Sequence, residues 1–386
     1  MGVFSGYNLP RDIVMISTAD WDASLWTNKQ HIASRLTQDF RVVYVEPLKS
    51  IGQAKRGYNH RAWTDPKCGV HVFRPSVVIP FGNKLPSLNE INHYMISQPL
   101  RDYIRELGFD EYILWVYTPN GFPYLDILEP VLSCYDCVDE YSAFPGAWKT
   151  VTLQMEAKLI RDVDVVFTTA ETLYESKRRN NPNTYFIPNV GDFDLFSRAD
   201  VIEPARAIRM LRKKPVIGFV GALNYKIDEQ LVRDLFVNHP DKNFVFIGPD
   251  RGFGVERYKY NNVHFMGLRP PEDLPKYMAG FDVCIIPYKV DNYTRGVMPI
   301  KFYEYLATGR PVVTTPIPEL EKFSDLVEIA RTSEEFSASI ERALRNEDNE
   351  RKAKRIELAK SNSWETRIRS ILHHLEESYR QKLMNP

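Results

Sequence analysis

Lys301 and Glu304 stand three residues apart in the stretch "TRGVMPIKFYEYLATGRPVVTTP", between a proline and a glycine of the kinds found at helix ends. We expect a helix with Pro299 at its first position and Gly309 just past its last turn, so the two charged side chains share one face. A lysine beside the free backbone N–H groups of a first turn makes an anion site that suits a diphosphate. A glutamate one turn further on can accept hydrogen bonds from two neighbouring hydroxyls, such as those of a ribose. The alternative is a surface Lys–Glu pair that contributes about 0.2–0.5 kcal/mol.

A second candidate for chemistry is the carboxylate of Asp139, which follows the strand-like run "LSCYDC". In a parallel sheet, the end of such a strand is where an acceptor hydroxyl would be presented. A carboxylate there can take the proton of the hydroxyl as it attacks an anomeric carbon, and a single displacement of this kind inverts the configuration. Asp136 and Asp20 are the alternative bases. A capping or turn role for Asp139 is the structural alternative.

Three more residues are candidates for contact with a phosphate. Arg295 lies just before the predicted helix and would add a second cation. Lys226 follows the apolar run "VIGFVG", and for it a phosphate contact and a solvated surface position are both open. Gly221 ends the same run, and a glycine allows a ligand to approach the backbone closely.

Short apolar runs rich in Val, Ile, Phe and Tyr alternate with stretches of helical period along the chain. Continuous apolar strands of this kind are typical of parallel sheets that are covered on both faces. In the first half they read "DIVMIST", "FRVVYVEP", "VHVFRP", "YILWVY", "LSCYDC", "VDVVFTT" and "TYFIP". In the second half they read "VIGFVG", "FVFIG", "VHFMG", "VCIIPY" and "PVVTTP". The pattern predicts an α/β protein with two Rossmann-like, doubly wound domains that face a cleft.

The break between the two halves falls in residues 188–214, where no apolar period is maintained. We place one domain at residues 1–190 and the other at 191–363. Residues 364–386 predict an amphipathic helix, because apolar residues recur there at helical spacing. These residues are Trp364, Ile368, Ile371, Leu375, Tyr379 and Leu383.

The stretch "GVMPIKFYEYLATGRPVVTT" resembles the donor-nucleotide motif of the group 1-like glycosyltransferases, which have the GT-B fold. The stretches "VIGFVGALNYK", "VHFMGLRPPEDLPKYMAGFDVCIIPY" and "FIPNVGDFDLF" agree with this resemblance. It implies that residues 1–190 bind the acceptor, that residues 191–363 bind a nucleotide-sugar, and that the C-terminal helix crosses back to the N-terminal domain. It also implies that Glu304 binds the ribose and that Gly267 occupies the turn where the nucleobase is seated.

The chain departs from this family at one functional position. Many retaining members carry a Glu-x7-Glu motif, and Gly296 stands where the first glutamate would be. The xanthan-type glucuronosyltransferase also resembles the chain, and it has an aspartate base four residues after a strand tyrosine, as Asp139 follows Tyr135. Its Met-Lys element corresponds to Met298 and Lys301. The resemblance therefore favours an inverting enzyme of the hexosyl- or glucuronosyltransferase type.

Two D-x-D spacings bear on whether the transferase needs a metal. They are Asp162/Asp164 and Asp192/Asp194, at a strand entrance and in the hinge between the domains, and we interpret both as structural. Helix N-termini and cations can replace a metal on a diphosphate. We therefore expect no metal and no cofactor besides the nucleotide-sugar donor, with UDP as the expected nucleotide.

A basic stretch lies between Glu46 and Asp65, where no acid interrupts four cations and several apolar side chains. The cations are Lys49, Lys55, Arg56 and Arg61. Such a stretch can rest on anionic lipid headgroups, and a mobile, solvated loop is the alternative. The acceptor is expected to be a glycan or a polyprenyl-diphosphate-linked sugar.

Composition excludes several other classes of protein. Lys+Arg and Asp+Glu balance at 50 each, so no overall field indicates a nucleic-acid partner. Four cysteines are too few for a disulfide scaffold, and we interpret Cys134 and Cys137 as buried and structural. No apolar run reaches the length of a transmembrane helix and no signal-peptide pattern is present, so we expect a cytoplasmic protein with peripheral contact at the inner face of the membrane.

The sequence thus predicts transfer of a sugar from a nucleotide-sugar to an acceptor hydroxyl in surface polysaccharide assembly. The alternatives are a retaining transferase without a protein base, a nucleotide-sugar epimerase and a non-catalytic sugar-binding module on the same fold.

Overall fold

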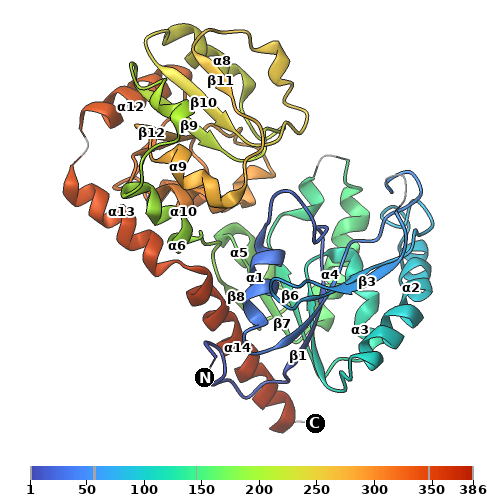
Figure 1. The fold of residues 1–386 in the computed structure, drawn as a ribbon. Coiled ribbons are helices and arrows are strands. Elements are labelled where there is room, and N and C mark those ends of the chain that lie inside the picture. Colours follow the sequence, from blue (N-terminus) through green and yellow to red (C-terminus); the bar gives the residue numbers. More distant parts are fainter. Residues whose placement is uncertain (1, 55–57, 145, 347, 385–386) are drawn as a thin grey trace. The chain divides into compact units, whose positions relative to one another are not determined.

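The computed structural model describes residues 2–54, 58–144, 146–346 and 348–384. The chain divides into two compact units, coloured along the sequence in Figure 1. Unit 1 comprises Met1–Pro188 and Glu365–Pro386, and unit 2 comprises Asn189–Trp364. The boundaries that the sequence predicts are 190/191 and 363/364. Lys55 and Arg56 of the basic stretch lie outside the described residues.

Unit 1 is built on an eight-stranded sheet with the strand order β3-β4-β2-β1-β5-β6-β7-β8. Seven of its strands are parallel, and they are the seven predicted ones: β1 (Asp12–Ile16), β2 (Arg41–Val45), β4 (His71–Arg74), β5 (Tyr112–Val116), β6 (Leu132–Cys137), β7 (Val165–Thr168) and β8 (Thr184–Phe186). Sequence reasoning missed β3 (Arg61–Thr64), which pairs antiparallel with β4. Its side chains are mostly exposed, so it lacks the apolar run that marks the other strands.

Unit 2 is built on a parallel six-stranded sheet with the order β11-β10-β9-β12-β13-β14. Its strands are β9 (Val216–Val220), β10 (Asn243–Ile247), β11 (Val263–Phe265), β12 (Val283–Ile286), β13 (Val312–Thr314) and β14 (Glu328–Ile329). The first five were predicted, and β14 is a two-residue edge strand too short to give a pattern. Counted along the sequence, the order is 3-2-1-4-5-6, which is that of dinucleotide-binding Rossmann folds.

Helices connect the strands in both units. Those of unit 1 are α1 (Asn28–Leu36), α2 (Pro86–Glu106), α3 (Pro123–Leu128), α4 (Lys149–Asp162), α5 (Glu171–Lys177) and, after its first residue, α14 (Trp364–Met384). Those of unit 2 are α6 (Phe193–Phe196), α7 (Arg206–Arg209), α8 (Glu229–Asn238), α9 (Leu274–Met278), α10 (Ile300–Ala307), α11 (Pro318–Glu321), α12 (Ser333–Arg345) and α13 (Asn349–Ser361). Short 3₁₀ turns include η1 (Pro119–Gly121), η2 (Tyr141–Ala143) and η6 (Thr294–Gly296).

Each unit has its own hydrophobic core, because the parallel strands are buried on both faces. All the residues of β1, β5 and β6 are buried in unit 1, and all those of β9, β10 and β12 are buried in unit 2. Cys134 and Cys137 are free thiols within buried β6, which agrees with the structural interpretation of this pair.

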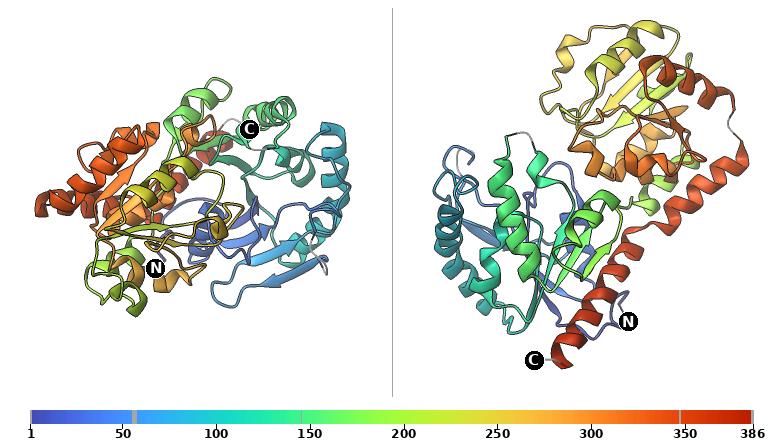
Figure 2. Two further views of the ribbon diagram at one scale, coloured as in Figure 1. Left: turned by 90° about the horizontal axis from the view of Figure 1, so that it is seen from above. Right: turned by 180° about the vertical axis from the view of Figure 1, so that it is seen from behind.

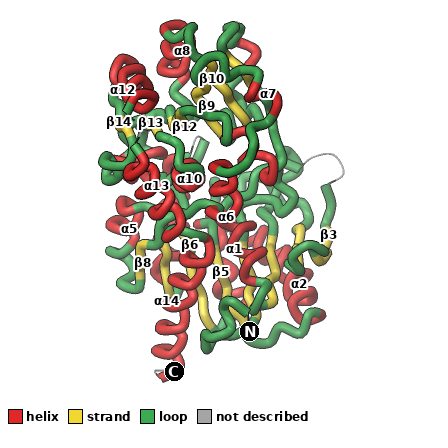
Figure 3. Tube along the Cα trace, turned by 60° about the vertical axis from the view of Figure 1, so that its left-hand side comes forward, coloured by secondary structure: helices red, strands yellow, loops and turns green. Residues whose placement is uncertain are grey.

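Helix α14 belongs to unit 1, as predicted for the C-terminal segment, and it runs beside the strands of that unit in Figures 2 and 3. Ile368, Ile371 and Leu375 of the predicted apolar face are fully buried. Leu383 is instead 60% exposed, so the buried face ends before the last turn. Among the described residues, no helix is both long and apolar enough to cross a bilayer.

Candidate functional site

The carboxyl ends of β9 and β12 form the point where the strand order of unit 2 reverses. β10 and β11 follow β9 on one side, and β13 and β14 follow β12 on the other. In open parallel sheets, ligands bind beyond the strand ends at such a switch point. The chain leaves β9 at Gly221 and leaves β12 toward Tyr288, and both residues contact Lys301.

Lys301 is the second residue of α10 and is held between two aromatic rings. Its Nζ lies 5.1 Å from the centroid of the Phe219 ring and 4.9 Å from that of the Tyr288 ring. Nζ also donates a hydrogen bond to the Tyr288 hydroxyl. Pro299 is the N-cap rather than the first helical residue, so the helix starts one position later than predicted. The ammonium group is therefore preorganised at a helix N-terminus, where anions bind.

The Tyr288 phenol responds to the positive charge around it. Burial raises the pKa of this phenol, but the charges of Lys301 and Lys226 and the hydrogen bond from Lys301 outweigh burial and lower the pKa below its ordinary value of 10. Two cations thus act on one hydroxyl at the end of β12, which indicates a locally positive site.

Glu304 lies one helical turn beyond Lys301 and is partly buried. Burial raises its pKa to about 7, although the charge of Lys301 acts in the opposite direction. Within the described part of the chain, its carboxyl group has no hydrogen-bond or ion-pair partner. A partly desolvated carboxyl without a protein partner is suited to binding hydroxyl groups of a ligand.

Gly221 leaves room for the lysine. Its φ is +147°, and a Cβ added there would lie 2.9 Å from both Cε and Nζ of Lys301. The sequence predicts that a ligand approaches the backbone at Gly221. In the structure, the group close to this backbone is the Lys301 side chain. The cage of Phe219 and Tyr288 was missed by sequence reasoning, because it joins residues from three separate segments.

The loop at the start of unit 2 supports the same helix. Asn189 Nδ2 donates a hydrogen bond of 2.6 Å to the Met298 carbonyl oxygen. A Cβ added to Gly191 would lie 2.8 Å from the backbone nitrogen of Glu304, so this loop packs directly against α10. The sequence predicts only a hinge for this stretch.

The remaining predicted donor-site residues lie in different environments. Lys226 Nζ stands 4.8 Å from the centroid of the Tyr293 ring, and Arg295 is exposed in η6. Gly267 is exposed after β11 and accepts a hydrogen bond from the Gly248 N–H. Met298 differs, since its side chain is only 1% exposed and belongs to the hydrophobic core.

The candidate bases of unit 1 lie at the carboxyl edge of its sheet or within it. Asp139 follows β6, is partly buried, and accepts a 3.5 Å hydrogen bond at its carbonyl oxygen from the Cys137 thiol. Asp20 follows β1 and forms a 2.5 Å ion pair with Lys49. Asp136 is fully buried within β6 and pairs with Arg367 at 3.3 Å. Asp136 therefore has a structural role, and the role of Asp139 stays a prediction.

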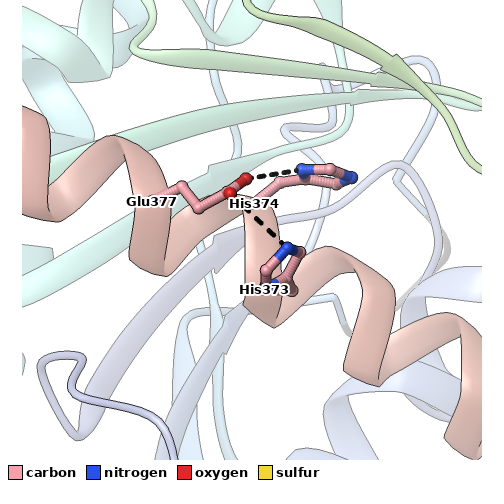
Figure 4. Close-up of side chains that lie close together, drawn as sticks. All are labelled: His373, His374 and Glu377. Carbon is pink, nitrogen blue, oxygen red and sulfur yellow. Dashed lines mark hydrogen bonds and ion pairs between the residues drawn. The ribbon is translucent and has the colours of Figure 1, made fainter.

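A group of metal-ligand types lies away from these residues, on α14 (Figure 4). His373 Nε2 lies 3.5 Å from one carboxylate oxygen of Glu377, and His374 Nδ1 lies 3.1 Å from the other. His374 also stacks on Tyr185 of β8 with ring centroids 3.8 Å apart. Glu377 can satisfy both imidazoles directly, so the arrangement is explained by side-chain pairing on a helix surface.

Comparison with known proteins identifies the class to which this arrangement belongs. Residues 214–346 match the family model described as "Glycosyl transferases group 1". The chain is 29% identical over 285 residues to the teichuronic acid biosynthesis glycosyltransferase TuaH of Bacillus subtilis (strain 168), over 68% of this chain and 71% of TuaH. The chain is a glycosyltransferase with a group 1 domain.

Solved structures show the fold of this glycosyltransferase. An alpha,alpha-trehalose-phosphate synthase (UDP-forming) from Burkholderia vietnamiensis has a TM-score of 0.70 at 12% identity, over 97% of this chain and 100% of that chain. Anabaena Alr3699/HepE, in complex with UDP and glucose, has a TM-score of 0.62 at 13% identity, over 98% and 100% of the chains. The two Rossmann-like units are those of the GT-B fold, which confirms the fold class predicted from sequence.

Proposed function

We propose that this glycosyltransferase moves a sugar from a UDP-sugar to a hydroxyl of a glycan or polyprenyl-diphosphate-linked acceptor. We place the reaction in surface polysaccharide assembly, at the cytoplasmic face of the membrane. The observation that carries the proposal is the caged ammonium of Lys301 at the start of α10, with the Glu304 carboxyl one turn away. TuaH is named for teichuronic acid biosynthesis, and two similar structures are named with UDP, which supports the acceptor class and the nucleotide.

On the donor side, the site stabilises the departing diphosphate. Lys301 and the first-turn N–H groups of α10 face the charge that grows as the bond to the sugar breaks. Because the Phe219 and Tyr288 rings already hold the ammonium group, little reorganisation is needed at the moment of reaction. Lys226 and Arg295 add positive charge, so the transfer needs no metal ion. Glu304 accepts hydrogen bonds from the ribose hydroxyls.

On the acceptor side, Asp139 takes the proton of the attacking hydroxyl. A single base and a single displacement invert the configuration at the anomeric carbon. Gly296 offers no side chain where many retaining relatives place a glutamate. A retaining transferase without a protein base is the second candidate, and Gly296 does not favour it.

Thermal unfolding with UDP, GDP, ADP and dTDP, without metal, tests the donor site. UDP at 100 times its Kd should stabilise the protein by about 2.7 kcal/mol, which corresponds to a rise in Tm of several degrees at roughly 2–4 °C per kcal/mol. Lys301→Ala and Glu304→Ala should lose this rise, whereas Lys276→Ala, an exposed lysine paired with Asp273, should keep it. Absence of any nucleotide-dependent rise in the unmodified protein would remove the donor-site proposal.

The acceptor side is tested by Asp139→Asn and by NMR of the anomeric configuration of the product. We expect the variant to lose about 10²–10⁴-fold in kcat while its UDP-induced rise in Tm stays unchanged. Near-normal turnover would eliminate Asp139 as the base, and retained configuration would favour the second candidate. Isomerisation of the donor without any acceptor would instead indicate an epimerase.

A further inference from the structure

We propose that unit 1 docks on an anionic bilayer surface through an exposed apolar patch beside the carboxyl edge of its sheet. The patch consists of Ile51, Phe81, Leu85, Tyr94, Met95 and Trp148, together with the cation of Lys84. This proposal rests on the proposed function in one respect: a lipid-linked acceptor would have to reach this edge of the sheet. The contact with lipid stands on the observations that follow.

The six apolar side chains are far more exposed than large apolar groups usually are. Their exposed fractions range from 49% for Met95 to 78% for Ile51. On α2, the exposed positions between Ser87 and Gln98 include Ile91, Tyr94 and Met95 but only one charged residue, Glu90. A helix face turned to water normally carries more charge. Concentrations of this kind mark interaction surfaces.

Contacts within the unit bring these residues together. Lys84 Nζ lies 4.7 Å from the centroid of the Phe81 ring and 4.8 Å from that of Trp148, so one cation joins the turn before α2 to the start of α4. The bridge between Ser50 and Val78 places Ile51 next to the segment that leads to Phe81. These contacts link the loop after β2, the turn that leads into α2 and the start of α4.

The backbone at Phe81 is held in an unusual conformation. Its φ is +72°, in the left-handed region that bulky L-residues rarely adopt. The ring that this conformation supports is 57% exposed. A strained residue that is not used for core packing indicates a functional constraint, and here the constraint presents an aromatic ring to the outside.

The charged side chains of the patch favour an anionic lipid surface as its binding partner. Residues 50–54, 78–98 and 148–153 carry the patch, and their charged side chains are Lys84 and Lys149 against the single acid Glu90. Aromatic side chains flanked by lysines are typical of the bilayer interface, and lysines favour anionic headgroups. The turn at Phe81 follows β4 and Trp148 follows β6, so the patch lies at the strand ends, as Asp139 does. An acceptor anchored in the bilayer would reach the same edge.

Co-sedimentation with vesicles tests this docking surface. The protein should partition onto vesicles of phosphatidylcholine and phosphatidylglycerol in equal parts at low salt, and much less onto pure phosphatidylcholine or in 0.5 M salt. Phe81→Ser/Trp148→Ser should lower partitioning at least tenfold, and Lys84→Gln should lower it severalfold on anionic vesicles only. The control Met210→Ser/Val237→Ser, which removes two exposed apolar side chains of unit 2, should leave partitioning unchanged.

Either of two results would overturn the proposal: the unmodified protein stays in solution with anionic vesicles, or the control variant loses as much binding as the patch variant. A protein that ignores vesicles while its patch variant raises the KM of a soluble glycan acceptor would show a sugar subsite instead. Tyr94→Ser/Met95→Ser provides a second patch variant if the first does not fold. The UDP-induced rise in Tm, read in the same variants, reports on unit 2 separately, so docking and donor binding can fail independently.

Discussion

The carboxyl group of Glu304 lies partly buried beside a cation and without a partner among the described side chains. Burial raises its pKa from an ordinary value of 4.5 to about 7. The folded protein therefore holds this proton more tightly than the unfolded chain does, and stability must fall as pH rises from about 4.5 to 7. The partly buried carboxyl group of Glu304 thus lowers the stability of the protein at neutral pH.

Glu304→Gln should raise the free energy of unfolding by about 2–3 kcal/mol at pH 8, because the amide has no charge to desolvate. The gain should nearly vanish at pH 4, where the carboxyl group is protonated in both states. Urea unfolding at the two pH values measures the difference. Glu272→Gln, at an exposed position, serves as the control and should change little. Equal stability of Glu304→Gln and the unmodified protein at pH 8 would contradict the raised pKa.

Gly221 gives a second prediction at the scale of single residues. Gly221→Ala adds a methyl group 2.9 Å from Lys301 Nζ at a φ of +147°, so both the backbone and the ammonium group must shift. We expect a loss of roughly 1–2 kcal/mol in stability and a loss of about tenfold in UDP affinity, measured by calorimetry. Gly6→Ala, which meets nothing within 4 Å, should change neither. Unchanged UDP affinity in Gly221→Ala would mean that Lys301 does not need its present position.

At the scale of elements, α14 is fixed to unit 1 by an ion pair that is wholly buried. Arg367 and Asp136 each have 0% side-chain exposure and lie 3.3 Å apart. Arg367 also donates hydrogen bonds to the carbonyl oxygens of Ile187 and Pro188, at the end of the first part of unit 1. One side chain therefore connects the returning helix to β6 and to the segment that leaves the unit.

Arg367→Met should destabilise unit 1 by about 3–5 kcal/mol at pH 8, because Asp136 keeps a buried charge without its main partner. Acidification should relieve part of this loss, since burial already raises the pKa of Asp136. The double variant Asp136→Asn/Arg367→Met should recover part of the stability. Chemical unfolding of the three proteins measures these differences, and a double variant no better than the single one would indicate that the carbonyl contacts, rather than the ion pair, hold the helix.

The strands were predictable because buried parallel strands are continuous apolar runs, which leave a clear mark in the sequence. The helix at Lys301 was predictable from its flanking proline and glycine, although Pro299 caps it instead of starting it. The edge strands β3 and β14 were not predictable, because an exposed strand or a two-residue strand has no continuous apolar run. The cage around Lys301 and the core position of Met298 depend on contacts between distant segments, which local spacing does not encode.

At the scale of the whole molecule, each unit completes its own sheet and core, yet unit 1 is discontinuous in the chain. Its residues before Pro188 and after Glu365 enclose all of unit 2 in the sequence. Ile368, Ile371 and Leu372 of the returning segment are fully buried. Until α14 has been synthesised and has packed against it, the first part of unit 1 therefore leaves some of its apolar surface exposed.

A chain ending at residue 363 should expose this apolar surface on unit 1 while unit 2 keeps the proposed nucleotide site. We expect increased binding of a hydrophobic dye and proteolysis within residues 1–188, together with UDP-dependent protection of residues 189–363. A chain ending at residue 382 loses the last four residues, of which Leu383 and Met384 are described and have largely exposed side chains, and it should behave like the full chain. Full protection of residues 1–188 in the shorter chain would show that the first part folds without its helix.

The discontinuity of unit 1 also sets an order of events on the ribosome. About 180 residues separate Pro188 from the turns of α14 that cover unit 1. At a synthesis rate of 5–20 residues per second, the incomplete sheet must wait roughly 9–35 s for its last helix. Unit 2 is contiguous in the sequence and can complete its folding before unit 1, although it is translated after the first part of unit 1. During that interval, the strand face that later receives α14 is an apolar surface that a chaperone can hold.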